Sequence, residues 1–145
     1  MRLCSIFILG TAMIAVVMLT GCGGGDGGDT TPPIISSVAV SVPLSFSFEG
    51  GPVVISAKVT DAGGVAQVSA TISGPGSESP TTVPMSLTSG STYSGEYTAP
   101  ENLREDGQAE TYSVVIVARD NAGNTSQSEP VTFQVPAPDM PDPPF

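Results

Sequence analysis

The chain contains no histidine, and this absence excludes several common kinds of catalytic site. A Ser-His-Asp triad requires an imidazole as its base, and His-based metal sites require one as a ligand. Tryptophan is also absent, which leaves little ring surface for the sugar-binding cleft of a carboxylate-based glycosidase. We therefore expect a protein that is not an enzyme.

Basic residues are scarce, with 4 Lys and Arg against 14 Asp and Glu and a net charge of −10. Nucleic-acid binding depends mainly on neutralisation of phosphates by Lys and Arg, and attraction to anionic lipid headgroups needs the same residues. Lys58, the lone lysine, alternates outward on an expected strand, which disfavours a Ser–Lys dyad. No nucleic-acid partner is expected.

The two cysteines, Cys4 and Cys22, flank a short apolar segment. Residues Ile6–Leu19 would rise only about 21 Å as a helix, less than the roughly 30 Å hydrocarbon core of a bilayer. With Arg2 as a positive start, this segment is typical of a secretory signal rather than a membrane span.

The motif Leu19-Thr20-Gly21-Cys22 resembles the lipobox of bacterial lipoproteins, in which the signal is cut just before the cysteine. The resemblance implies that residues 1–21 are removed and that Cys22 carries a diacylglyceryl thioether and often an acylated amine. Two or three acyl chains hold a protein stably at a membrane. The implied location is the bacterial cell envelope. Gly23 after Cys22 resembles the outer-membrane sorting of Gram-negative relatives.

The mature chain divides into three parts by composition. Residues 22–33 contain the lipidated cysteine and a flexible Gly-rich linker that spans about 18 Å on average. Residues 34–136 have the alternating pattern of strands, and the Pro-rich residues 137–145 are expected to form an extended, exposed tail. Because Cys4 leaves with the signal and Cys22 carries lipid, no disulfide is expected.

Apolar residues alternate with polar ones in about seven short runs that are separated by Gly-, Pro- and Asp-rich turns, which predicts an all-β fold. Pro84 indicates an edge strand. An antiparallel sandwich fits best, with a small barrel as the alternative. The expected strands cover 37–42, 53–60, 66–72, 83–87, 93–97, 112–118 and 131–135.

The stretch from Tyr112 to Asn124, which reads YSVVIVARDNAGN, resembles the penultimate strand and final hairpin of bacterial Ig-like and fibronectin type III domains. The resemblance implies an Ig-like antiparallel β-sandwich, with Tyr112 as a corner tyrosine whose hydroxyl bonds to upstream backbone. Asp106 stands where the fibronectin family places a leucine.

Because histidine and a free cysteine are lacking, a metal ion could be bound only through oxygen ligands. Calcium needs only such ligands and is therefore the possible cofactor. In an Ig-like sandwich the loop after the second strand and the loop before the last strand share one end, so Asp61 is expected near Asp120, Asn121 and Asn124. The same residues suit turns in which Asp and Asn bond their own backbone, and this interpretation is preferred, so no metal or other cofactor is expected. A second acidic group at the other end faintly resembles the cadherin arrangement; it comprises Glu49, Glu101, Glu105, Asp106, Asp139 and Asp142.

Three functions remain open for the domain. The first is a structural, protein-interaction or adhesion module for an envelope protein, surface protein or polysaccharide. The second is a carbohydrate- or ligand-binding accessory module, which would require exposed rings among Tyr93, Tyr97, Phe46 and Phe48. The third is a calcium-binding, cadherin-like domain.

Overall fold

A computed structural model of the 145-residue chain describes residues 28–75 and 79–138. Within these ranges all regular structure is β-strand, and no helix is long and apolar enough to cross a membrane. The expected strands are confirmed, and the structure adds one short strand, β7. The strands are β1 (Ile34–Ser41), β2 (Gly51–Thr60), β3 (Val65–Ser73), β4 (Thr81–Ser89), β5 (Thr92–Ala99), β6 (Glu110–Asp120), β7 (Thr125–Gln127) and β8 (Val131–Val135).

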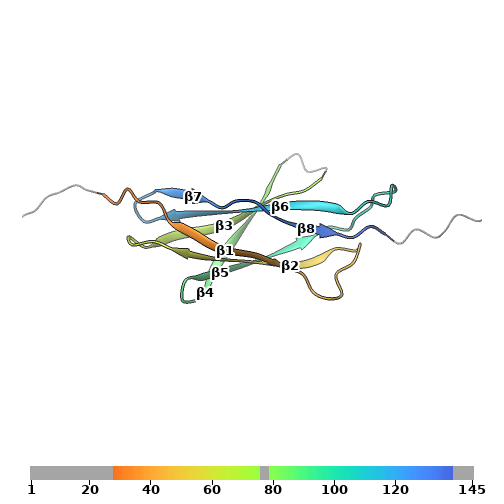
Figure 1. Cartoon of the computed structure of the whole chain (residues 1–145), viewed down its shortest axis with the longest axis horizontal. Coiled ribbons are helices and arrows are strands. Elements are labelled where there is room, and N and C mark those ends of the chain that lie inside the picture. Colours follow the sequence, from red (N-terminus) through yellow and green to blue (C-terminus); the bar gives the residue numbers. More distant parts are fainter. Residues whose placement is uncertain (1–27, 76–78, 139–145) are drawn as a thin grey trace, which may run out of the picture.

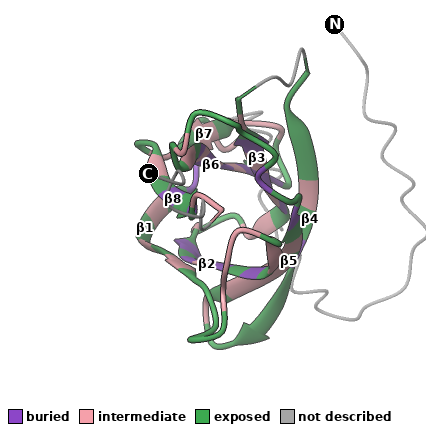
Figure 2. Ribbon diagram, turned by 90° about the vertical axis from the view of Figure 1, so that its right-hand side faces the viewer, coloured by how far each residue is buried: buried purple, intermediate pink, exposed green. Residues whose placement is uncertain are grey.

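The strands form two packed layers that are joined into one curled antiparallel sheet (Figures 1 and 2). One layer contains β1, β2 and β5, and the other contains β3, β6, β7 and β8. Strand β4 belongs to both, because Thr81–Met85 pair with β3 whereas Ser86–Ser89 pair with β5. The result is an all-β, sandwich-like fold that is consistent with an Ig-like domain.

The crossing of β4 explains one residue of β4 and one of its neighbour β5. Each half of the strand has a hydrogen-bonded neighbour on one side only, so Pro84, which lacks an N–H, is tolerated there as on an edge strand. A Cβ at Gly95 on β5 would lie 3.1 Å from the Pro84 carbonyl oxygen and 3.2 Å from Met85 Cγ. Glycine at this position therefore leaves room for β4 to pass between the layers.

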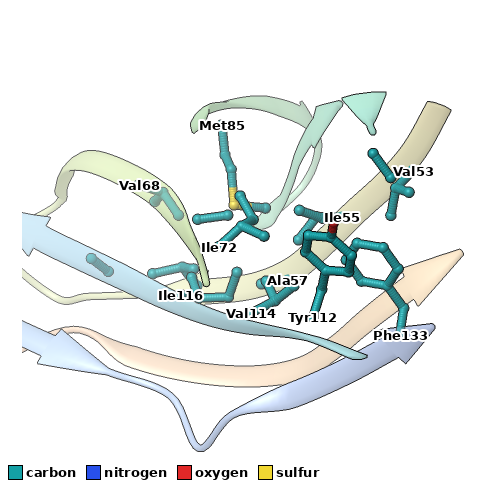
Figure 3. Close-up of a cluster of buried hydrophobic side chains, with 14 of the residues drawn as sticks. Val53, Ile55, Ala57, Val68, Ile72, Met85, Tyr112, Val114, Ile116 and Phe133 are labelled. Carbon is teal, nitrogen blue, oxygen red and sulfur yellow. The ribbon is translucent and has the colours of Figure 1, made fainter. Parts of the chain in front are cut away.

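The core lies between the layers and consists of the inward residues of the alternating runs (Figure 3). Val53, Ile55, Val114 and Ile116 are fully buried, and each such side chain contributes about 1.5–3 kcal/mol relative to exposure. Toward the C-terminal end of β8, the rings of Tyr112 and Phe133 stack with centroids 5.1 Å apart. Leu87 departs from the pattern, because its side chain is 56% exposed although it follows Met85 in the alternation.

The two edges of the curled sheet do not pair with each other, so within the described residues the sheet does not close into a barrel. Strand β1 lies beside β8, but its hydrogen-bonded partner is β2. A bulge interrupts β1 at Ser37, whose φ of 51° is the single positive value outside glycine in the described chain. Such a bulge twists an edge strand away from further pairing. The sandwich interpretation therefore holds over the barrel alternative.

Candidate functional site

One end of the sandwich gathers three carboxylates, and we refer to Asp29, Asp61 and Asp120 as the acidic cluster. One carboxylate oxygen from each lies within 4.8 Å of the others. Asp61 follows β2 and Asp120 ends β6, so the structure brings these two together as the sequence predicted. Asp29 precedes β1, and sequence reasoning did not assign it to this group.

Asp120 is the buried member of the acidic cluster, with 2% of its surface exposed. Its Oδ1 accepts hydrogen bonds from the backbone N–H groups of Gly123 (2.6 Å) and Asn124 (2.8 Å), and its Oδ2 accepts one from Asn124 Nδ2 (2.7 Å). Burial works to raise the pKa of Asp120, but these hydrogen bonds outweigh it and hold the pKa below its usual value. Asp120 is therefore a carboxylate at neutral pH.

The two asparagines expected to join a calcium site act here as hydrogen-bond donors. Asn121 Nδ2 donates to the Gly63 carbonyl (3.0 Å), which ties the β6–β7 turn to the β2–β3 loop. Asn124 Nδ2 donates to the backbone carbonyl of Asp29 (2.8 Å) as well as to Asp120. The bonds from Asn121 to Gly63 and from Asn124 to Asp29 are long-range ties between segments, and the bond from Asn124 to Asp120 lies within the turn.

The segment before β1 is attached to this end of the domain. Besides the bond from Asn124, Asp29 Oδ1 accepts a hydrogen bond from the Thr31 N–H (2.9 Å), and Pro33 is buried. The pattern Asp-x-Thr typifies an Asx turn, and it was the signal in the sequence that could have distinguished residues 28–33 from a free linker.

The acidic cluster offers chemistry suited to a hard cation. Asp61 Oδ1 accepts the Gly63 N–H (2.8 Å), which fixes this carboxylate at the β2–β3 loop. Ca²⁺ takes six to eight oxygen ligands, so three carboxylates would supply part of a coordination shell, with backbone carbonyls and water completing it. Asp29, Asp61 and Asp120 are the residues that would hold such an ion.

At the opposite end, one buried amide organises the β5–β6 loop. Asn102 is 1% exposed, and its Nδ2 donates to the carbonyls of Gln108 (2.9 Å) and Pro136 (2.9 Å). Its Oδ1 accepts the Arg104 N–H (3.0 Å), and its own N–H donates to the Phe48 carbonyl (2.7 Å). Asn102 thus joins the β1–β2 loop, the β5–β6 loop and the end of β8.

The corner role expected for Tyr112 was wrong in its bonding partner. The Tyr112 hydroxyl donates to the side chain of Glu110 (3.1 Å) rather than to upstream backbone. Burial and then the Glu110 carboxylate raise the pKa of Tyr112, so the hydroxyl keeps its proton. Asp106, which stands where fibronectin type III domains have a leucine, accepts hydrogen bonds from the Arg104 side chain and from the Gln108 N–H (3.1 Å).

The second set of acidic residues, which was expected at this end, does not come together among residues 28–75 and 79–138. Within these ranges the acidic cluster at the other end is the one group of three or more carboxylates close enough to share an ion. Asp106 is taken up by an ion pair with Arg104, and Asp139 and Asp142 lie outside the described residues. This end instead has a pocket of about 300 Å³, lined by Phe48, Glu101, Asn102, Leu103, Arg104, Glu105 and Pro138.

The aromatic residues considered for ligand stacking lie mostly against the core. Tyr93, Tyr97 and Phe46 are half-buried and pack on the core cluster, and Phe48 lines the pocket described above. Tyr97 also contacts Tyr112 and Phe133, each with ring centroids 6.3 Å apart. Among the described residues, these side chains therefore do not form the exposed, coplanar pair that a sugar-binding face requires.

The lipidation site Cys22 and the signal segment 1–21 lie outside the described residues. Neither a protein-family model nor a curated protein sequence matches the chain.

Proposed function

We propose that this protein is a lipid-anchored bacterial envelope lipoprotein whose domain acts as a non-enzymatic structural, protein-interaction or adhesion module. The lipobox-like motif ending at Cys22 supports the anchor. The observation that carries the proposal is that the chain enters β1 and leaves β8 at opposite ends of the elongated domain (Figure 1). An anchor on the N-terminal side thus directs the C-terminal end of the sandwich away from the bilayer.

The geometry of the attached segment sets how far the domain stands from its anchor. Because Asp29 bonds Asn124, only residues 23–28 separate Cys22 from the first contact with the domain. Glycine-rich chain of that length spans roughly 13 Å on average. The acidic cluster then faces the membrane, and the opposite end faces outward.

The outward end has the features of a contact surface. Leu44 in the β1–β2 loop and Leu103 in the β5–β6 loop are both exposed, the latter by 75%, and the pocket of about 300 Å³ lies beside Leu103. Loops that a rigid sandwich positions are where binding residues are found disproportionately often. The partner class is an envelope or surface protein, or a polysaccharide.

Mass spectrometry of protein recovered from its host membranes tests the anchor. We expect a mature N-terminus at Cys22 with added acyl mass, and loss of both in a Cys22→Ser variant. Soluble protein with an unmodified Cys22 thiol would overturn the proposed location.

Crosslinking on intact cells tests the contact surface. The double substitution Leu44→Ser and Leu103→Ser should abolish the crosslinked products, whereas Ile34→Ser, which alters an exposed residue at the anchored end, should leave them unchanged. Equal crosslinking by all three proteins would show that the outward loops are not the contact surface.

A calcium-responsive domain is the second candidate, favoured by the assembly of the acidic cluster. An extracellular-type site with a dissociation constant near 1 mM would stabilise the fold by about 1.4 kcal/mol in 10 mM Ca²⁺. The thermal midpoint should then rise with calcium relative to chelator, and Asp61→Asn should remove the rise. An unchanged midpoint in the wild type would end this candidate.

A further inference from the structure

Strand β5 is paired on both sides over only part of its length. On one side it bonds to β2 from Thr92 to Ala99. On the other side β4 pairs only with residues 92–94, because the rest of β4 crosses obliquely to β3 (Figure 1). Within residues 28–75 and 79–138, no strand pairs with this side of residues 95–99, which we call the open β5 edge.

The register shows which backbone groups point toward the open β5 edge. The Val59 N–H donates to the Ser91 carbonyl (2.9 Å), directly beyond the last pair of the β2–β5 ladder. In an antiparallel pair, alternate residues bond to the same neighbour, so the odd-numbered residues of β5 face β2. The N–H and carbonyl groups of Glu96 and Thr98 therefore face away from β2. Pro52, which has no N–H, stands opposite Thr98, in agreement with this pattern.

The open β5 edge has the chemistry that recognises another main chain. Glu96 and Thr98 are both exposed, and together they offer two N–H and two carbonyl groups along an extended strand. The part of β4 that diverges from them offers a poorer edge, since Pro84 has no N–H. An extended peptide supplies matching groups at the same spacing, whereas a polysaccharide does not. Because β5 ends three residues before Asn102, this edge lies at the outward end of the domain, as Leu103 does.

We propose that the open β5 edge binds an extended segment of a protein partner by strand addition. This inference rests on the proposed interaction module and specifies the chemistry of its partner. The residue opposite Glu96 lies on the outer face, where a Lys or Arg makes a favourable cross-strand pair. Its neighbours point inward, onto the half-buried side chains of Tyr97 and Val83 at the margin of the core. The segment therefore alternates basic and apolar residues, which also suits the net charge of −10.

A seven-residue peptide of alternating Val and Lys tests the edge, with the full-length Cys4→Ser, Cys22→Ser chain in detergent. We expect saturable NMR shifts of the Glu96 and Thr98 amides, and binding at least about tenfold tighter than that of a peptide of Val and Glu. Glu96→Lys should reverse this preference. N-methylation of the Lys residues, whose N–H groups face β5, should abolish binding, whereas N-methylation of the Val residues should not. Equal binding of the two methylated peptides, or none of the unmodified peptide at millimolar concentration, would overturn the proposal.

The backbone of Thr98 can be tested directly. Thr98→Pro removes one N–H from the open β5 edge and leaves the bonds to β2 in place, so it should weaken the Val and Lys peptide at least about tenfold. Thr98→Val keeps the N–H and should bind as the wild type does. In the free wild type, the N–H groups of Glu96 and Thr98 should exchange with solvent much faster than that of Tyr97, and the peptide should slow them. Slow exchange of both without peptide would show that the edge is already paired and would contradict the proposal.

Crosslinking on intact cells separates this inference from the proposed function. Thr98→Pro should remove the crosslinked products, as the double substitution of Leu44 and Leu103 should. Products that persist in Thr98→Pro but disappear in the double variant would refute strand addition and leave the interaction module standing. Peptide binding in the absence of any crosslinked product would support the edge and contradict the proposed function.

Discussion

The two ends of the sandwich are held together by opposite chemistry. At the N-terminal end, Asp120 is 2% exposed and accepts three hydrogen bonds from the turn that follows it. At the other end, Asn102 is 1% exposed and donates to carbonyl groups of separate segments. Each end thus relies on one buried polar side chain that satisfies backbone groups left unpaired by loops.

The difference lies in charge. Asp120 fixes its turn as an ionised acceptor, so that end depends on pH and has further carboxylates nearby. Asn102 is neutral, so the network around it does not titrate. The end of a sandwich can therefore be organised either by a carboxylate that accepts hydrogen bonds from the N–H groups of its own turn or by an amide that donates to carbonyls of several segments. Of the two, the carboxylate also offers anionic oxygens to a cation.

The largest effect is expected from Asn102→Asp. The substitution preserves shape but turns a donor into a charged acceptor that faces the carbonyls of Gln108 and Pro136. A buried, unpaired polar group of this kind destabilises by about 3 kcal/mol or more. Urea unfolding at pH 7 measures the change. Gln108→Ala serves as control because the network uses only the backbone of Gln108, and it should shift the midpoint little.

A pair of Gly→Ala substitutions compares the packing of the two ends. A Cβ at Gly74 would overlap the buried ring of Tyr112, which is held against Phe133, so Gly74→Ala should cost about 1–3 kcal/mol. A Cβ at Gly63 would meet the carboxylate tip of Asp29, which can rotate away, so the cost there should stay under about 1 kcal/mol. Thermal unfolding of both variants measures the difference, and the reverse order would show that the N-terminal end is the tighter one.

The third-largest effect is expected from low pH, which should weaken the stabilisation at the Asp120 end and leave that at the Asn102 end unchanged. Because the folded pKa of Asp120 is depressed, its contribution to stability is present above the unfolded pKa of about 3.9 and is lost as the pH falls through the folded value. The hydrogen bond from Arg104 also lowers the pKa of Asp106, so the measurement belongs in about 1 M salt, which screens exposed pairs. Asp120→Asn should be less stable than wild type at pH 7 and lose less stability between pH 5 and 2. An unchanged acid response would place the sensitivity elsewhere.

The smallest effect is expected from the Arg104–Asp106 pair. Both side chains are substantially exposed, at 41% and 51%, and water screens their attraction. Arg104→Ala should move the urea midpoint less than either glycine substitution, and high salt should erase the shift. A salt-resistant loss would instead indicate that the Arg104 stem packs in the pocket.

The strands were predictable because burial of one sheet face imposes a period of two on the sequence. The runs Val53–Val59 and Tyr112–Ala118 carry that period clearly, and alternate residues of both are buried as expected. Strand β7 was missed because Thr125–Gln127 is too short to show it. Asp61 and Asp120 were placed together from topology alone, whereas Asp29 was not, because it reaches the cluster from outside the strands through the Asn124 side chain.

By itself, the sequence determined the all-β class and the approximate strands, because composition and alternation are local properties. Composition also excluded catalytic and metal sites that need histidine, and it disfavoured surfaces that bind phosphates through Lys and Arg. Tertiary structure alone decided how β4 crosses between the layers, which buried amide organises the β5–β6 loop, and that Asp29 joins Asp61 and Asp120 at one end. Those outcomes depend on contacts between residues far apart in the chain, such as Asp29 with Asn124 and Asn102 with Pro136. No local pattern encodes them, since each requires the position of a second segment in space.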